Sequence, residues 1–149
     1  MKKYTQKDFD EFETDEHGTK ICPRGDYTAI KEFGECCSFG KDCSFGKCCS
    51  FGKCCSFGER CSFGECCKIE KDKELDAFLK FEGFGSERRC TYFFKLTDGK
   101  IYVRCGCFAG YIDEFRAKVK ETHKDSKYAQ GYLKIADLAE WQFEENKNE

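Results

Sequence analysis

Residues 33–68 read FGECCS-FGKDCS-FGKCCS-FGKCCS-FGERCS-FGECCK, six hexapeptides in succession without a slip. A fixed short period predicts stacked strands in which each unit buries its apolar face against neighbouring units instead of forming an ordinary globular core. We expect the first and fifth positions of each unit to point inward, because side chains alternate along a strand. These structural positions are Phe33, Phe39, Phe45, Phe51, Phe57 and Phe63, with Cys37, Cys43, Cys49, Cys55, Cys61 and Cys67.

This unit resembles the hexapeptide of left-handed parallel β-helices, in which a large apolar residue is followed by a small one and, after two free positions, by another small one. The resemblance implies three hexapeptides per coil, or 18 residues, although the residues alone leave the handedness open. Phe is bulkier than the usual aliphatic residue, so either the coil is wider or the cysteines make room for it. We expect the glycines to serve the bends, where a side chain is awkward.

The charges give an independent indication of the coil length. At a spacing of 18, four pairs have opposite charges, as a parallel ladder favours: Glu35 with Lys53, Lys41 with Glu59, Lys47 with Glu65, and Asp42 with Arg60. A spacing of 12 suits the third position alone nearly as well. The run therefore predicts a stack of two to three coils, which needs further core from its flanks.

The predicted fold is mainly β with α, in four parts. Residues 1–20 form an N-terminal cap with a helix over 6–13, residues 21–70 the hexapeptide β-helix, and residues 71–89 a linker. Residues 90–149 form a small ββαα module packed on the coil end. Its strands, 90–96 and 101–108, flank Asp98-Gly99, a strong hairpin signal, and its helices span about 112–123 and 127–143.

Composition excludes several function classes. The net charge is -2 with 36% charged residues, so no basic field attracts nucleic acid or an anionic membrane. No apolar run is long enough to span a membrane, and the N-terminus lacks a secretion signal. These features predict a cytoplasmic protein without a membrane partner. In that compartment the fourteen cysteines are expected to be thiols that pack as small hydrophobes.

Metal binding is the first chemical hypothesis that the cysteines raise. Adjacent cysteines in the repeats point to opposite faces of a strand and are poorly placed to chelate together. A second candidate set is Cys90, Cys105, Cys107 and His123, for which packing of Cys105 and Cys107 on one strand face, with Gly106 easing a bulge, is the preferred interpretation. We therefore expect no catalytic residue and no cofactor, and a cysteine- or metal-dependent enzyme is the least favoured function.

Basic and aromatic residues on and before the hairpin form the best candidate ligand site. They are Arg88, Arg89, Lys95, Tyr102 and Arg104. Such residues can bind a phosphate, a nucleotide or a nucleic-acid strand. The competing interpretation is a solvated strand face.

The repeats and the segments Tyr92-Phe93-Phe94, Asp98-Gly99 and Val103-Arg104-Cys105-Gly106-Cys107-Phe108 together resemble a group of small uncharacterised proteins from anaerobic Firmicutes and their phages. The resemblance implies an architecture and a mobile-element setting. The expected function is a non-enzymatic binding or scaffold protein, a phage or prophage accessory or anti-defence factor that contacts a host protein. A nucleotide- or nucleic-acid-binding module is the alternative. Exposed coil ends can be buried in a homodimer or under the flanking helices.

Overall fold

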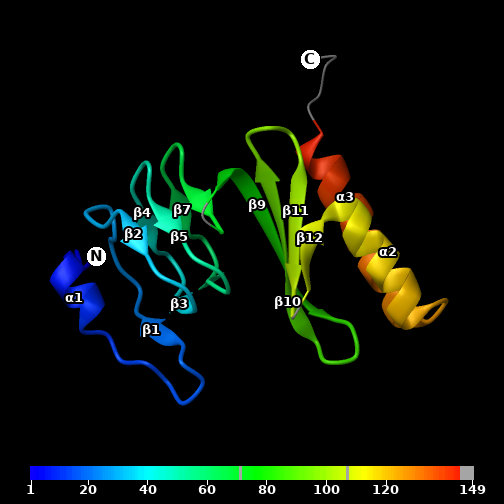
Figure 1. Ribbon diagram of the computed structural model, residues 1–149, viewed down its shortest axis with the longest axis horizontal. Coiled ribbons are helices and arrows are strands. Elements are labelled where there is room, and N and C mark those ends of the chain that lie inside the picture. The colour runs from blue at the N-terminus through cyan, green and yellow to red at the C-terminus, as the bar shows by residue number, and fades with distance from the viewer. Residues whose placement is uncertain (71, 107, 145–149) are drawn as a thin grey trace. The chain divides into compact units, whose positions relative to one another are not determined.

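The computed structural model describes residues 1–70, 72–106 and 108–144, and it contains both strands and helices (Figure 1). The chain divides into two compact units, Met1–Leu75 and Asp76–Glu149, which are described separately below. The largest sheet has the strand order β12-β11-β10-β9-β8-β5-β2. Strand β9, Lys73–Phe84, belongs to both units.

The first unit begins with helix α1, Gln6–Asp10, which is shorter than the expected 6–13. Thr5 caps it, because the Thr5 hydroxyl accepts from the backbone N–H of Asp8 at 3.2 Å and the Asp8 carboxylate accepts from the N–H of Thr5 at 2.9 Å. This reciprocal cap fixes the start of the helix. Phe9 is buried and meets the ring of Phe33 edge-to-face at 5.2 Å. The helix therefore covers part of the aromatic core of the repeats.

Short strands recur through the repeats and pair in parallel. They are β1 (Lys20–Cys22), β2 (Glu32–Phe33), β3 (Cys37–Phe39), β4 (Ser44–Phe45), β5 (Ser50–Phe51), β6 (Ser56–Phe57), β7 (Ser62–Phe63) and β8 (Lys68–Ile69). The pairs β2–β5, β3–β6, β4–β7 and β5–β8 all join residues 18 apart, the spacing that the charge pattern predicts. Of the four expected ion pairs, Asp42–Arg60 forms at 2.8 Å.

Two kinds of ring contact hold the aromatic core together. Rings 18 residues apart are stacked: Phe33 and Phe51 are 4.8 Å apart with planes at 9°. Rings six residues apart meet edge-to-face: Phe51 and Phe57 are 4.9 Å apart at 87°. Both geometries are favourable for aromatic pairs. A phenylalanine at every first position therefore allows each ring to use both contacts at once, which an aliphatic side chain cannot do.

The repeat glycines have a different role from the expected one. Gly34, Gly40, Gly46, Gly52, Gly58 and Gly64 do not have positive φ. Their neighbours approach too closely for a side chain: a Cβ on Gly58 would lie 2.5 Å from the backbone N of Lys41 and 2.6 Å from the carbonyl carbon of Gly40. Glycine is needed from the second repeat onward because a preceding part of the chain passes directly beside it.

The left-handed conformation falls two residues later, on the fourth position of each unit. Cys36, Asp42, Cys48, Cys54, Arg60 and Cys66 all have φ between 57° and 61°. Non-glycine residues other than Asn and Asp rarely adopt this conformation. The fourth-position side chains sit at the turns, and those of Cys48, Cys54, Arg60 and Cys66 are exposed.

The second unit contains an antiparallel sheet with two more strands than expected. Residues 73–84, assigned to a linker by the sequence, form β9, whose alternation of Leu79 and Phe81 with charged residues was obscured by its high charge. The hairpin of β10 (Arg89–Leu96) and β11 (Ile101–Cys105) is present around Asp98-Gly99. A turn at Gly106, φ 57°, ends β11, and Phe108–Tyr111 returns as β12, so 101–108 is not one strand.

Helices α2, Ile112–His123, and α3, Lys127–Phe143, lie side by side along one face of this sheet (Figure 1). Their buried residues and the inward side of the hairpin form one core, made by Phe93, Ile101, Val103, Ile112, Phe115, Val119, Ala129, Tyr132, Ile135, Ala136 and Ala139. Within the described part of the chain, no helix has the length and apolar character needed to cross a membrane.

Candidate functional site

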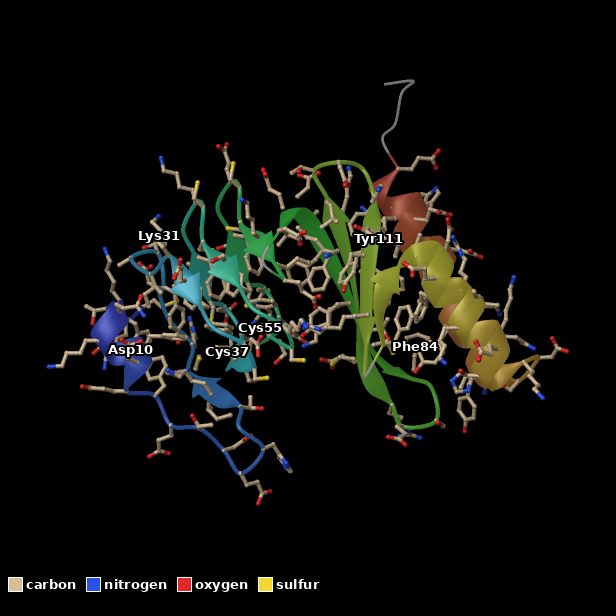
Figure 2. The ribbon with its side chains drawn as sticks, viewed as in Figure 1. Asp10, Lys31, Cys37, Cys55, Phe84 and Tyr111 are labelled. Carbon is tan, nitrogen blue, oxygen red and sulfur yellow. The ribbon has the colours of Figure 1, made fainter. Side chains whose placement is uncertain are left out.

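The fifth-position cysteines point into the repeat region and donate to glycine carbonyls. The thiol of Cys67 lies 3.1 Å from the carbonyl oxygen of Gly46 and 3.2 Å from that of Gly64. Figure 2 shows Cys37 and Cys55, 18 residues apart, near each other inside the repeats. A thiol is small and carries one weak donor, so it fills the interior corner and satisfies a buried carbonyl at the same time.

The surroundings of these thiols keep them protonated. A hydrogen bond with Cys22, together with burial, raises the pKa of Cys37 to about 12. Contact with Cys61 and burial raise the pKa of Cys43, and burial raises that of Cys49, 3.2 Å from the sulfur of Cys67. Nucleophilic attack and metal ligation both need the thiolate. These buried thiols are therefore suited to packing at neutral pH.

The second unit has a cavity of about 250 Å³ between its sheet and helices. It is lined by Ser86, Glu87, Cys105, Phe108, Phe115, Lys118, Val119, Thr122, His123 and Tyr132. Phe115 and Val119 give it an apolar floor. Its volume is close to the lower limit of about 300 Å³ for sites that hold drug-sized ligands, so it suits a small molecule or fragment.

Hydrogen bonds fix the polar side of this cavity. The hydroxyl of Thr91 donates to the sulfur of Cys105 at 3.3 Å, and the hydroxyl of Tyr132 donates to the carbonyl oxygen of Phe84 at 3.2 Å. The sulfur of Cys105 lies 3.7 Å from that hydroxyl, and the ring of His123 is centred 5.7 Å from the Tyr132 ring. The cavity thus combines an aromatic wall with a fixed thiol and an imidazole.

The alternative metal set is only partly brought together. Cys105 and His123 share the cavity. Because Thr91 pairs directly with Cys105, the preceding residue Cys90 points to the other face of the sheet, where its thiol lies 3.6 Å from Glu82 Oε1. Cys107 lies outside the described residues. Among the residues that are described, no group of three or more His, Cys, Asp or Glu side chains is arranged to hold a metal ion.

The basic candidate residues are not gathered into one pocket. Arg88 is exposed in the turn before β10, at φ 51°, and the side chain of Arg89 is outside the described part. Lys95 pairs with Asp76 at 3.5 Å. Tyr102 is buried, and its ring meets that of Tyr111 at 5.6 Å.

Arg104 is engaged within its own sheet. Its guanidinium lies 4.9 Å from the ring centre of Tyr92 and 5.6 Å from that of Phe94. These two rings are stacked, 5.5 Å apart with planes at 1°. A guanidinium over aromatic faces is stabilised by the ring quadrupoles, so this side chain has a structural role on its strand.

Sequence reasoning missed an exposed apolar pair on α3. The side chains of Leu138 and Trp141 are 48% and 68% exposed. Their positions fall outside the buried stripe of Tyr132, Ala136 and Ala139, so a helical projection could have found them. Tyr128, expected on the buried face, is instead 46% exposed. Trp141 is the most exposed large hydrophobic side chain among the described residues.

Comparison with protein-family models, with curated proteins and with solved structures gives no match for this chain. Its function must therefore be argued from its own residues.

Proposed function

We propose that this chain is a non-enzymatic binding protein in which the repeats act as a rigid spacer and helix α3 contacts a host protein. The observation that carries the proposal is the exposed pair of Leu138 and Trp141. Tryptophan is enriched among the few residues that supply most of the energy of protein–protein interfaces. An exposed Trp beside an exposed Leu is therefore a suitable anchor for a partner.

The helix that carries this pair is held in place. Arg116 of α2 lies 2.9 Å from Asp137 and 3.0 Å from Glu140 of α3 through the same guanidinium nitrogen. Asp137 and Glu140 immediately precede Leu138 and Trp141 in the chain. A binding surface that is ordered before association loses less conformational entropy on binding. The double ion pair thus supports a pre-formed contact surface.

We infer that the repeats form a short parallel β-helix. Three groups of parallel pairs recur along the chain: β1-β3-β6, β2-β5-β8 and β4-β7. Each group takes every third strand, as three faces of one 18-residue coil would. The stacked aromatic rings and the close approach at the glycines favour a stiff element, which suits a spacer.

The resemblance to repeat proteins of anaerobic Firmicutes and their phages suggests the kind of partner. A phage or prophage accessory protein of this design, including an anti-defence factor, acts by occupying a host protein. The acidic Asp137 and Glu140 beside the apolar pair favour a partner surface with an apolar pocket and basic edges.

The test compares the wild type with the double variant Leu138→Ala, Trp141→Ala as bait in lysate of the native host. Gln142→Ala, also exposed and on the same turn, is the matched control. We expect a host protein retained by the wild type and the control but lost with the double variant, and a purified partner whose affinity falls at least about tenfold.

Unchanged melting temperatures in all three proteins would show that the loss is local, because the replaced side chains are exposed. Retention of the same proteins by the double variant would contradict the proposal. Sedimentation supplies a second check: a wild-type dimer that becomes monomeric in the double variant would assign the surface to a homodimer instead.

A further inference from the structure

The fourth-position residues face one another between neighbouring repeats. Cys36 lies between two ladder pairs of 18-residue spacing, Phe33 with Phe51 and Ser38 with Ser56, and its N–H donates to the carbonyl oxygen of Lys53 at 2.8 Å. The residue opposite Cys36 is therefore Cys54. The thiols of Cys36 and Cys54 are hydrogen-bonded neighbours.

The same geometry recurs twelve residues later. The pairs Phe45 with Phe63 and Ser50 with Lys68 flank Cys48, whose N–H donates to the carbonyl oxygen of Glu65 at 2.7 Å. Cys48 therefore faces Cys66, and their thiols are also hydrogen-bonded. Cys48, Cys54 and Cys66 are exposed and Cys36 is half-buried, so an oxidant in solution can reach both pairs.

The third fourth-position pair shows that these side chains meet across the gap between repeats. Asp42 and Arg60 occupy the equivalent positions and are joined at 2.8 Å. Each of the three turns thus holds a complementary pair, one ionic and two made of thiols. Backbone conformation does not explain the cysteines, because φ near +60° favours Gly, Asn or Asp.

We propose that Cys36–Cys54 and Cys48–Cys66 are two sites of reversible disulfide formation that link successive repeats. Neighbouring strands lie about 4.8 Å apart, and disulfides join residues whose Cα atoms are about 4.4–6.8 Å apart. The positions can therefore be bridged without moving the backbone. This inference rests on the strand register and is independent of the partner proposed for α3.

The oxidant is a low-molecular-weight disulfide such as oxidised glutathione. The thiolate of one cysteine attacks a sulfur of the oxidant, which forms a mixed disulfide and releases one glutathione thiol. The thiolate of the facing cysteine then attacks the protein sulfur of the mixed disulfide and releases the second. Each pair loses two protons and two electrons, and each oxidant molecule becomes two thiols.

Burial and the neighbouring Cys54 raise the pKa of Cys36, and a hydrogen bond to Glu74 with its negative charge raises that of Cys66. Both thiols are mostly protonated at neutral pH. The reaction should accordingly accelerate as the pH rises, because the thiolate is the attacking species.

The test treats the full-length folded protein with oxidised glutathione, blocks remaining thiols by alkylation, and measures mass and tryptic peptides. We expect four of the fourteen thiols to resist alkylation with no glutathione retained. Peptide 32–41 should be linked to 54–60, and 48–53 to 61–68. The oxidised protein should melt at a higher temperature, and dithiothreitol should reverse the change.

Each linked peptide also carries a fifth-position cysteine, so variants assign the bonds. Cys36→Ser should abolish only the first link, and Cys66→Ser only the second. Links that survive in these variants would place oxidation in the buried row and overturn the proposal. Stable glutathione adducts or intermolecular dimers in place of the two links would also overturn it. Protein oxidised in denaturant gives the scrambled pattern for comparison.

Discussion

Arg60 holds Asp42 with two hydrogen bonds across 18 residues of sequence, from Nε to Oδ1 at 2.8 Å and from a terminal nitrogen to Oδ2 at 3.3 Å. Arg24 approaches the same carboxylate at 3.8 Å. This planar two-bond contact fixes the alignment of neighbouring repeats at a position where side chains reach outward. It also gives the repeat region a measurable dependence on pH.

The hydrogen bonds from Arg60 lower the pKa of Asp42 below its ordinary value. A carboxyl group with a depressed pKa in the folded state stabilises the fold above its unfolded pKa, and this stabilisation disappears as the pH falls through the folded pKa. Wild type should therefore lose more melting temperature than Arg60→Gln between about pH 5 and about pH 3. Lys41→Gln, which has an exposed side chain in the same coil, serves as control; equal losses in wild type and Arg60→Gln would refute the assignment.

The glycine contacts predict a difference between two chemically identical substitutions. Gly58→Ala places a methyl group 2.5 Å from the backbone of Lys41 and should destabilise the protein by about 1–3 kcal/mol. Gly34→Ala meets nothing within 4 Å and should change stability by less than about 1 kcal/mol. Urea unfolding measures both, and a similar loss in the two variants would argue against close approach as the reason for glycine.

The aromatic core predicts a gradient along the repeats. Phe51 is 1% exposed and contacts rings both beside it and 18 residues away, so Phe51→Ala should cost about 3–5 kcal/mol. Phe63 is half-buried in the last repeat, and Phe63→Ala should cost less. Guanidinium chloride unfolding compares them. Equal losses would mean that the rings contribute through their number and not through their position in the stack.

Arg104 provides a test of the nucleotide-binding alternative. Because its guanidinium lies over Tyr92 and Phe94, Arg104→Met should lower stability by about 1–2 kcal/mol. Lys100→Met, whose exposed ammonium lies 5.3 Å from the Tyr111 ring, should cost less. Calorimetric titration with nucleotides and a single-stranded oligonucleotide should not separate the variants from wild type. Lost binding with unchanged stability would favour the basic hairpin as a ligand site.

The periodic features were predictable from the sequence. The phase of the phenylalanines, the spacing of 18 and the helices around Phe115 and Tyr132 all follow from local repetition of apolar residues. The reason for each glycine was not predictable, because it depends on a backbone segment 17 residues away in the chain.

Parts of the second unit and its cavity also lay beyond sequence reasoning. Strand β9 alternates apolar and charged residues so irregularly that its pattern is weak, and the turn at Gly106 divides what appears to be one strand. The cavity joins Cys105 to His123 and Tyr132, which come from three separate elements. Such a meeting is set by tertiary packing, which no local motif encodes.

The 18-residue register has a genetic consequence. Recombination between repeated codons would add or remove six residues at a time, and every such event would keep the aromatic rows intact. Loss of residues 45–50, however, would place Asp42 opposite Cys66 and Cys36 opposite Arg60. Only changes of three hexapeptides preserve all facing pairs. The heritable unit of this protein is therefore three times longer than the unit visible in its sequence.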